Sequence, residues 1–237
     1  MENYLEISYE NNMKMLNVAY EYCNYNFSYN DIIEVLKGDD DIKKQLALIE
    51  LKNINSQADA NILVFNLTQH SGPIRETTSF KILDLISKQE YCGYFQTDDI
   101  LNTFVKAITD INPSVSRNAV DIIKYVENKQ YLYNEILKEI NITLSNIDET
   151  TTNRSYVQNK KNFNLYWNLE AITSIADYIN PCEKLLNILI KTANSNDYTI
   201  REKTAKVASL FNATNKSFEE VLSLLKNDKN IYVQRFI

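Results

Sequence analysis

The sequence predicts an all-α fold, an α–α superhelix (solenoid) of about five to six helical hairpins. Two observations carry this prediction. Glycine and proline each occur only three times in 237 residues, far below the roughly 7% and 5% of average proteins. The chain therefore lacks the residues on which tight turns between strands depend. The second observation is an apolar pattern of helical period that returns in one register along the chain.

The clearest copy of this pattern occupies residues 111–126. Asn112 suits a helix cap, and Pro113 suits the first helical turn. The apolar residues that follow are spaced i, i+4, i+7, i+8 and i+11, which places them on one helix face. They are Val115, Ala119, Ile122, Ile123 and Val126.

Related faces recur in the segments 39–51, 71–86, 164–176, 196–211 and 230–237. Their apolar members are Ile42, Leu46 and Ile49; Ile74, Thr78, Ile82, Leu85 and Ile86; Leu165, Leu169, Ile172 and Ala176; Ile200, Thr204, Val207, Ala208 and Phe211; and Val233 and Ile237. Apolar segments of the same period lie between them, and the last of these segments opens on a capping box, Ser217-x-x-Glu220. The repeating unit is thus two antiparallel helices every roughly 32 to 50 residues. Stacking buries a face that one hairpin cannot bury alone.

Two regions depart from the repeats. Residues 1–27 contain a helix that we expect to cap the open end of the stack, with one apolar face formed by Leu5, Tyr9, Leu16, Tyr20 and Cys23. Residues 146–164 are polar, and we expect them to lengthen the loop of the fourth hairpin and to be mobile. No linker is evident, so we predict a single domain over 1–237, with repeats over 28–237.

The turns before these helices resemble the D/N-x-x-V/I-R signature of HEAT repeats. The signature stands as Gly72-Pro73-Ile74-Arg75, as Asn112 to Val115 with the arginine delayed to Arg117, as Asp197 to Arg201, and more weakly as Asp40 to Lys43. The chain is thus similar to the HEAT-repeat (HEAT/armadillo-like) α-solenoid family after residue 28. The resemblance implies that the second helices line a concave surface. It also implies that the arginines pair with turn aspartates of neighbouring repeats, and a row facing a ligand is the alternative.

If the second helices line the inner surface, their solvent-facing positions follow the first apolar residue of each. In order they are Lys43, Lys44, Arg75, Glu76, Ser116, Arg117, Tyr166, Trp167, Arg201, Glu202, Gln234 and Arg235. Mixed charges around central aromatics favour a protein or peptide surface. We therefore nominate Lys43, Arg75, Arg117, Tyr166, Trp167 and Arg201 as partner-binding residues. Trp167 either packs beneath the 146–164 insertion or is an exposed recognition residue.

Residues for catalysis or metal binding are scarce. His70 is the only histidine, and the cysteines Cys23, Cys92 and Cys182 lie far apart. We interpret the cysteines as buried apolar residues of a reducing compartment. The acidic run Asp39 to Asp41 suits a helix N-terminus better than a calcium loop. We expect no cofactor, no metal and no catalytic site.

The sequence thus favours a non-catalytic scaffold that binds another protein or a peptide segment. An alternative is suggested by DNA alkylation-repair glycosylases, which resemble this chain in size and in using HEAT-like hairpins. Trp167 with Asp121 or Asp177 would then face the lesion. The net charge of −6 and the pI near 5.0 disfavour nucleic acid.

The last repeat is short, which suggests self-association through the C-terminal repeat or a place as an accessory subunit of a complex. Neither a signal peptide nor a membrane-spanning run is evident, so we expect a cytoplasmic protein without a membrane partner.

Overall fold

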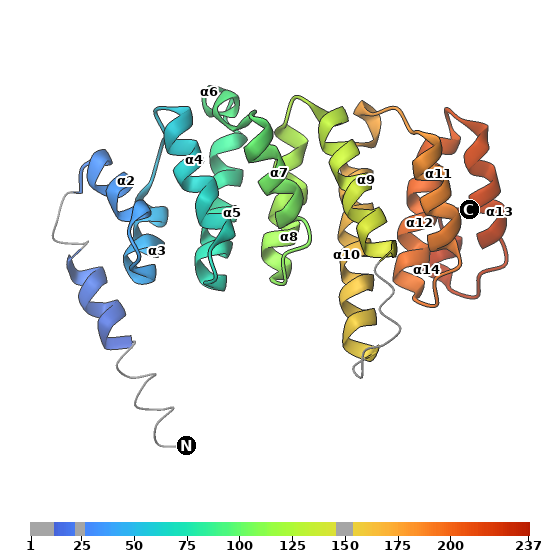
Figure 1. The fold of residues 1–237 in the computed structure, drawn as a ribbon, viewed down its shortest axis with the longest axis horizontal. Coiled ribbons are helices and arrows are strands. Elements are labelled where there is room, and N and C mark those ends of the chain that lie inside the picture. Colours follow the sequence, from blue (N-terminus) through green and yellow to red (C-terminus); the bar gives the residue numbers. More distant parts are fainter. Residues whose placement is uncertain (1–11, 22–26, 146–153) are drawn as a thin grey trace, which may run out of the picture. The chain divides into compact units, whose positions relative to one another are not determined.

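The computed structural model describes residues 12–21, 27–145 and 154–237, so the predicted face residues Leu5, Tyr9 and Cys23 lie outside the described ranges. Every regular element in these ranges is helical, and they contain no strand (Figure 1). This confirms the predicted all-α class. The chain divides into two compact units, Met1–Ile100 and Leu101–Ile237. A single domain over 1–237 stays a prediction.

Unit 1 contains a helix over residues 12–21 and two helical hairpins. The hairpins are α2 (Tyr29–Lys37) with α3 (Asp41–Glu50), and α4 (Gln57–Phe65) with α5 (Gly72–Ile86), the 3-10 turn η1 (Asn66–Thr68) lying between α4 and α5. Two short elements that the sequence did not predict follow, α6 (Gln89–Cys92) and η2 (Gly93–Phe95). First helix packs on first helix (α2 on α4) and second on second (α3 on α5), which is the stacking of a repeat protein.

Unit 2 contains four hairpins, of which the first begins at the boundary. They are α7 (Asp98–Ala107) with α8 (Pro113–Ile122) and η3 (Ile123–Tyr125); α9 (Lys129–Ser145) with α10 (Arg154–Ile175) and η4 (Ala176–Tyr178); α11 (Glu183–Ala193) with α12 (Tyr198–Asn212); and η5 (Lys216–Phe218) and α13 (Glu219–Leu225) with α14 (Ile231–Gln234). The second helices pack in chain order, α8 on α10, α10 on α12 and α12 on α14.

Most of the predicted apolar faces form the core. All five members of the α8 face are at most 1% exposed, and the faces of α5 and α12 are buried throughout. Two terminal members deviate, because Ala176 is half-buried and Ile237 is 45% exposed. In α5, α8 and α12 the helical period identified the buried face correctly.

The predicted face of α3 is wrong. Ile49 is 60% exposed, whereas Ala47 and Leu48 are completely buried and Lys44, expected in solvent, is only 3% exposed. A second stripe of helical period runs through Lys44, Ala47, Leu48 and Leu51, spaced i, i+3, i+4 and i+7. Packing against α5 selects this stripe, and the aliphatic stem of Lys44 is long enough to take part in it.

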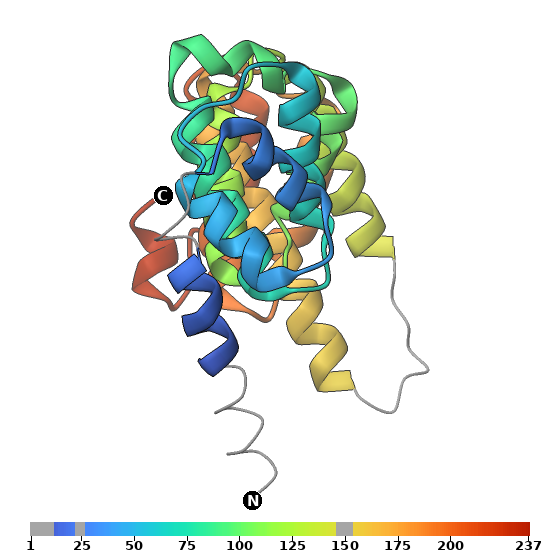
Figure 2. The same cartoon turned by 90° about the vertical axis from the view of Figure 1, so that its left-hand side faces the viewer.

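The predicted face of the N-terminal helix is also wrong where it is described. Leu16 and Tyr20 are 63% and 72% exposed, while Val18 is buried. An ion pair of 3.7 Å between Lys14 Nζ and Asp40 links this helix to the start of α3, at the end of unit 1 shown in Figure 2. The helix therefore presents its apolar stripe to solvent and packs through the side that holds Val18.

The polar segment 146–164 is not a loop throughout, because α10 begins at Arg154. Residues 146–153 lie outside the described ranges. Figure 1 shows the N-terminal end of α10 reaching past the ends of α8 and α12. Because this end extends beyond the neighbouring helices, it does not need an apolar face. Its lysine, arginine and glutamine residues favour a helix. The side chains of Gln158 and Asn162 are hydrogen-bonded across one turn, at 2.7 Å.

Helix starts follow the expected chemistry, with one correction. Asp40 caps α3 by accepting from the backbone nitrogens of Ile42 and Lys43, at 3.0 and 3.2 Å, as predicted for the acidic run. The predicted capping box at Ser217 is wrong, because Asn215 accepts from the Ser217 nitrogen and caps η5 instead. The cap therefore lies at Asn215, two residues before the predicted cap residue Ser217.

Tyrosines join neighbouring first helices, as their amphipathic character leads one to expect. The Tyr29 hydroxyl of α2 donates to Asp59 of α4 at 2.7 Å, and the Tyr131 hydroxyl of α9 donates to Asn102 of α7 at 3.0 Å.

The prediction of buried cysteines is wrong for the two that are described. Cys182 is exposed and Cys92 is half-buried, because both stand at the ends of helices rather than within a core stripe.

Candidate functional site

One side-chain contact closes the turn within four of the hairpins. The residue six positions after a turn residue donates to that residue's carbonyl oxygen. The four pairs are Arg75 to Gln69, Ser116 to Asp110, Arg201 to Ser195 and Gln234 to Asp228, at 2.9, 2.9, 2.8 and 2.9 Å. This contact fixes the alignment of the repeats. It agrees with the alignment taken from the apolar pattern, in which Ser116 stands where Arg75 and Arg201 stand and Arg117 follows one residue later.

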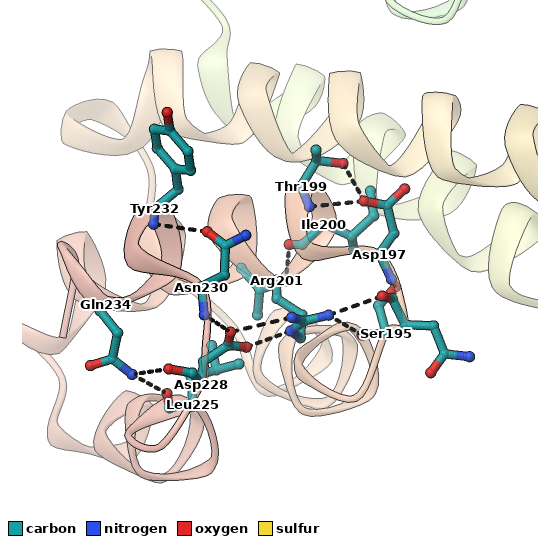
Figure 3. A network of polar contacts seen from close by, with 12 residues as sticks. Ser195, Asp197, Thr199, Ile200, Arg201, Leu225, Asp228, Asn230, Tyr232 and Gln234 are labelled. Atoms are coloured by element: carbon teal, nitrogen blue, oxygen red, sulfur yellow. Dashed lines mark hydrogen bonds and ion pairs between the residues drawn. The ribbon is translucent and has the colours of Figure 1, made fainter.

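Arg201 has a second contact that links two hairpins (Figure 3). Its guanidinium holds the carboxylate of Asp228 in the α13–α14 turn through Nε and Nη2, the Nη2–Oδ1 distance being 3.2 Å. The Asn230 backbone nitrogen donates to the same carboxylate at 2.8 Å. The hydrogen bond from Arg201 lowers the pKa of Asp228. Arg201 thus pairs with the turn aspartate of the neighbouring repeat, as the HEAT resemblance implied.

The two candidates in unit 1, Arg75 and Lys43, have different surroundings. Arg75 donates through Nη1 to the carbonyl oxygens of Gln69 and His70, both at 2.9 Å, and so closes its own turn. Lys43 is half-buried. It lines an open hollow of about 530 Å³ between the N-terminal helix and the start of α3, together with Met13, Lys14, Asn17, Val18, Glu21 and Asp40.

Tyr166 and Trp167 of α10 form an aromatic patch with Phe163, one turn earlier on the same helix. The Trp167 ring meets the Tyr166 ring edge-to-face at 5.4 Å between centroids, and the Phe163 ring at 6.3 Å. All three side chains are half-buried, so each offers part of its ring to a ligand. We call these three residues the α10 patch. Phe163 was missed in the sequence because it lies in the segment interpreted as a loop.

A charged cluster between α10 and α12 borders the α10 patch. Lys203 Nζ lies 4.7 Å from the centroid of the Tyr166 ring and 2.7 Å from Glu170 Oε2, while Lys206 reaches the other oxygen of Glu170 at 3.5 Å. Burial disfavours both charges of the Lys203–Glu170 pair, yet their hydrogen bond and attraction prevail. The pKa of Glu170 is lowered and the pKa of Lys203 is raised. These contacts hold the Tyr166 ring in place beside Trp167.

The register of the cluster defines a row across the second helices. Asn162 Nδ2 donates to Asp197 at 2.9 Å, so Trp167 lies level with Glu202 of α12. Glu202 in turn pairs with Arg235 of the next hairpin. Arg117 occupies the equivalent position on α8, seven residues after Asp110, as Glu202 follows Ser195. We call the row Arg117, Trp167, Glu202 and Arg235, with the α10 patch, the second-helix surface of unit 2.

The two acidic residues nominated for a lesion site are Asp121 and Asp177. Asp121 is paired with Lys124 at 2.6 Å. Asp177 lies in η4, ten residues beyond Trp167, which is roughly 15 Å along a helix.

In the part of the chain that the structure describes, no group of His, Cys, Asp or Glu is placed to hold a metal ion. None of the helices described there is long and apolar enough to span a membrane.

No protein-family model and no curated protein sequence matches the chain. Solved structures do match. A computationally designed armadillo repeat protein for modular peptide recognition is 18% identical with a TM-score of 0.50, over 88% of this chain and 96% of that one. A designed armadillo repeat protein in complex with the peptide (KR)4 is 17% identical with a TM-score of 0.51, over 86% of this chain and 94% of that one.

An engineered protein from a structural genomics consortium is 15% identical with a TM-score of 0.50, over 86% of this chain and 93% of that one. At these identities the likeness concerns the fold. The chain is therefore an all-α solenoid with the HEAT/armadillo-like helical-repeat fold, as the turn signature indicated.

Proposed function

We propose that this protein is a non-catalytic interaction scaffold that binds a segment of another protein on the second-helix surface of unit 2. The observation that carries the proposal is the α10 patch. Aromatic and arginine side chains are the residues on which binding energy concentrates in protein interfaces. Here three partly open rings share a row across the second helices with the exposed Arg117, and the Lys203–Glu170 pair holds one ring in place.

A preorganised patch strengthens the proposal, because side chains that are already ordered lose little entropy on binding. Trp167 packs against the rings of Phe163 and Tyr166, and Tyr166 packs against Trp167 and Lys203.

The fold also supports the proposal. One designed armadillo protein of similar fold is solved with a peptide, so this architecture is able to present such a surface. Self-association and a cytoplasmic location stay predictions.

The test selects peptides from a displayed random library with the full chain and measures their affinity for variants. We expect Trp167→Ala to weaken the selected peptides roughly 30-fold, the effect of losing a hot spot of about 2 kcal/mol. Tyr178→Ala is the matched control, because Tyr178 is 70% exposed but lies in η4, at the other end of α10. Trp167 is the only tryptophan, so its fluorescence reports binding to the wild type and to Tyr178→Ala, and a fluorescent label on the peptide reports binding to Trp167→Ala.

Circular dichroism must show that both variants keep their helices. Selected peptides that bind Trp167→Ala and the wild type equally would exclude the α10 patch as the anchor. A selection that enriches no peptide would count against the scaffold itself.

A further inference from the structure

The charges of unit 2 are divided unevenly between first and second helices. The second helices of the last three hairpins, α10, α12 and α14 with the residues after it, carry seven basic residues and two acidic ones: Arg154, Lys160, Lys161, Arg201, Lys203, Lys206 and Arg235 against Glu170 and Glu202. The first helices of the same hairpins, α9, α11 and α13, carry four basic and five acidic residues. The overall charge of −6 therefore conceals a basic second-helix surface.

Both carboxylates of these three second helices are already engaged, and Asp121 of α8 is paired with Lys124. Glu170 accepts from Lys203 and lies 3.5 Å from Lys206. Glu202 is paired with Arg235, and its side chain is only 14% exposed. A basic ligand would have to displace a lysine or arginine to reach either carboxylate, which removes much of the gain.

The cations around the α10 patch are more accessible. Lys160 is exposed and lies on the stripe of Phe163 and Trp167, at i, i+3 and i+7. Arg117, in the same row as Trp167, is exposed. Within residues 12–21, 27–145 and 154–237 neither side chain makes an ion pair. Lys206 shares Glu170 with Lys203, so this trio keeps a net positive charge.

We propose that the second-helix surface of unit 2 recognises an acidic, extended protein segment. Its carboxylates would meet Arg117, Lys160 and Lys206, and an apolar side chain between them would rest on Trp167. This proposal rests on the proposed function and gives the partner its chemistry. A designed armadillo protein of similar fold is solved with the basic peptide (KR)4, so the acidic preference proposed here comes from the residues of this chain rather than from the fold.

A protein segment suits the surface better than a nucleic acid. Phosphate-binding surfaces draw their affinity from a continuous basic field, whereas Glu170 and Glu202 interrupt this one at two places. Unit 1 carries a net charge of −8 by sequence, with eight more acidic than basic residues in 1–100, and adds no attraction for a polyanion.

The experiment measures fluorescence anisotropy of three labelled nonapeptides with the full chain. All three have a central phenylalanine, and the flanks alternate Asp-Glu, Lys-Arg or Ser-Asn. We expect the acidic peptide to bind at least ten-fold tighter than the other two. We expect Arg117→Gln with Lys160→Gln and Lys206→Gln to weaken it at least ten-fold. The matched control removes three exposed lysines of the first-helix side, Lys184→Gln, Lys191→Gln and Lys216→Gln, and should change affinity less than three-fold.

Several results would overturn the proposal. A basic or neutral peptide that binds as tightly as the acidic one, and still depends on Trp167, removes the acidic preference and leaves the scaffold intact. No binding of the acidic peptide at millimolar concentration removes the preference as well, while the library selection tests the scaffold independently. A single-stranded oligonucleotide that displaces the acidic peptide and binds tighter would assign the surface to nucleic acid.

Discussion

At the scale of single residues, repeated chemistry sets the hairpin turns. In four hairpins a side chain donates a hydrogen bond to the turn carbonyl oxygen six residues before it. The donor is arginine in two hairpins, serine in one and glutamine in one. The signature arginine is therefore one solution to a backbone requirement. Arg201 makes a contact that Ser116 cannot make, because its guanidinium also hydrogen-bonds the carboxylate of Asp228. The Asp228 side chain is 6% exposed. A buried charge pair of this kind is costly to break from one side.

We expect Asp228→Asn to lower the free energy of unfolding by about 1.5–3 kcal/mol at pH 7, the range for hydrogen bonds to charged groups. The pKa of Asp228 is lower in the folded chain, so its contribution is complete above the unfolded pKa of about 3.9 and is lost as the pH falls through the folded pKa. Urea unfolding at pH 7 and pH 3 should show the difference shrinking at pH 3.

The control for that pair is Asp84→Asn, since Asp84 pairs with Lys88 on the surface, where both side chains are over 40% exposed. Such pairs contribute under about 1 kcal/mol. A difference for Asp228→Asn that stays constant from pH 7 to pH 3 would contradict the role of its charge.

At the scale of elements, a local pattern can leave two answers open. In α3 two stripes have helical spacing, and only packing on α5 decides between them. In α10 the polar first turns gave no apolar stripe, so their helicity could not be read from periodicity. Trp167 and Phe163 are brought together by that helix, because i and i+4 positions are neighbours on its surface.

The face of α3 is tested by two adjacent substitutions. We expect Leu48→Ala, at a fully buried position, to cost about 2–5 kcal/mol of unfolding free energy. Ile49→Ala, at a position 60% exposed, should cost under about 1 kcal/mol, because exposed substitutions lose little. Chemical denaturation of both variants measures this. The reverse order would restore the face first predicted from the sequence.

At the scale of the whole molecule, the chain forms two compact units, and within each unit neighbouring hairpins pack on one another. Stability in such a protein is close to a sum of repeat and nearest-neighbour contributions. The α10 patch, the Lys203–Glu170 pair and the acidic-partner proposal all belong to unit 2. Within the described residues, unit 1 contributes the hollow beside Lys43.

Hydrogen exchange should reveal this modularity. We expect Leu48→Ala to raise amide exchange mainly in unit 1 and Ile172→Ala mainly in unit 2, since both positions are fully buried in their own unit and local opening follows local contacts. Mass spectrometry of peptic fragments gives the exchange by region. An equal rise across both units from either substitution would mean that the chain unfolds as one block.

The sequence by itself determined the helical class and the order of the hairpins. It also identified the buried faces of α5, α8 and α12, because a helical period is a pattern among residues close together in the chain. Tyr166 and Trp167 were nominated because they directly follow Leu165, the first apolar residue of their helix face.

Only the tertiary structure decided the rest. Lys203 and Glu170 meet across 33 residues. The HEAT resemblance implied arginine–aspartate pairs between repeats, but the structure identifies Asp228, 27 residues on, as the partner of Arg201. The stripe that α3 buries and the exposure of Leu16 and Tyr20 likewise depend on which helices lie opposite. Such contacts join residues whose spacing in the chain carries no periodic signal, so packing alone selects them.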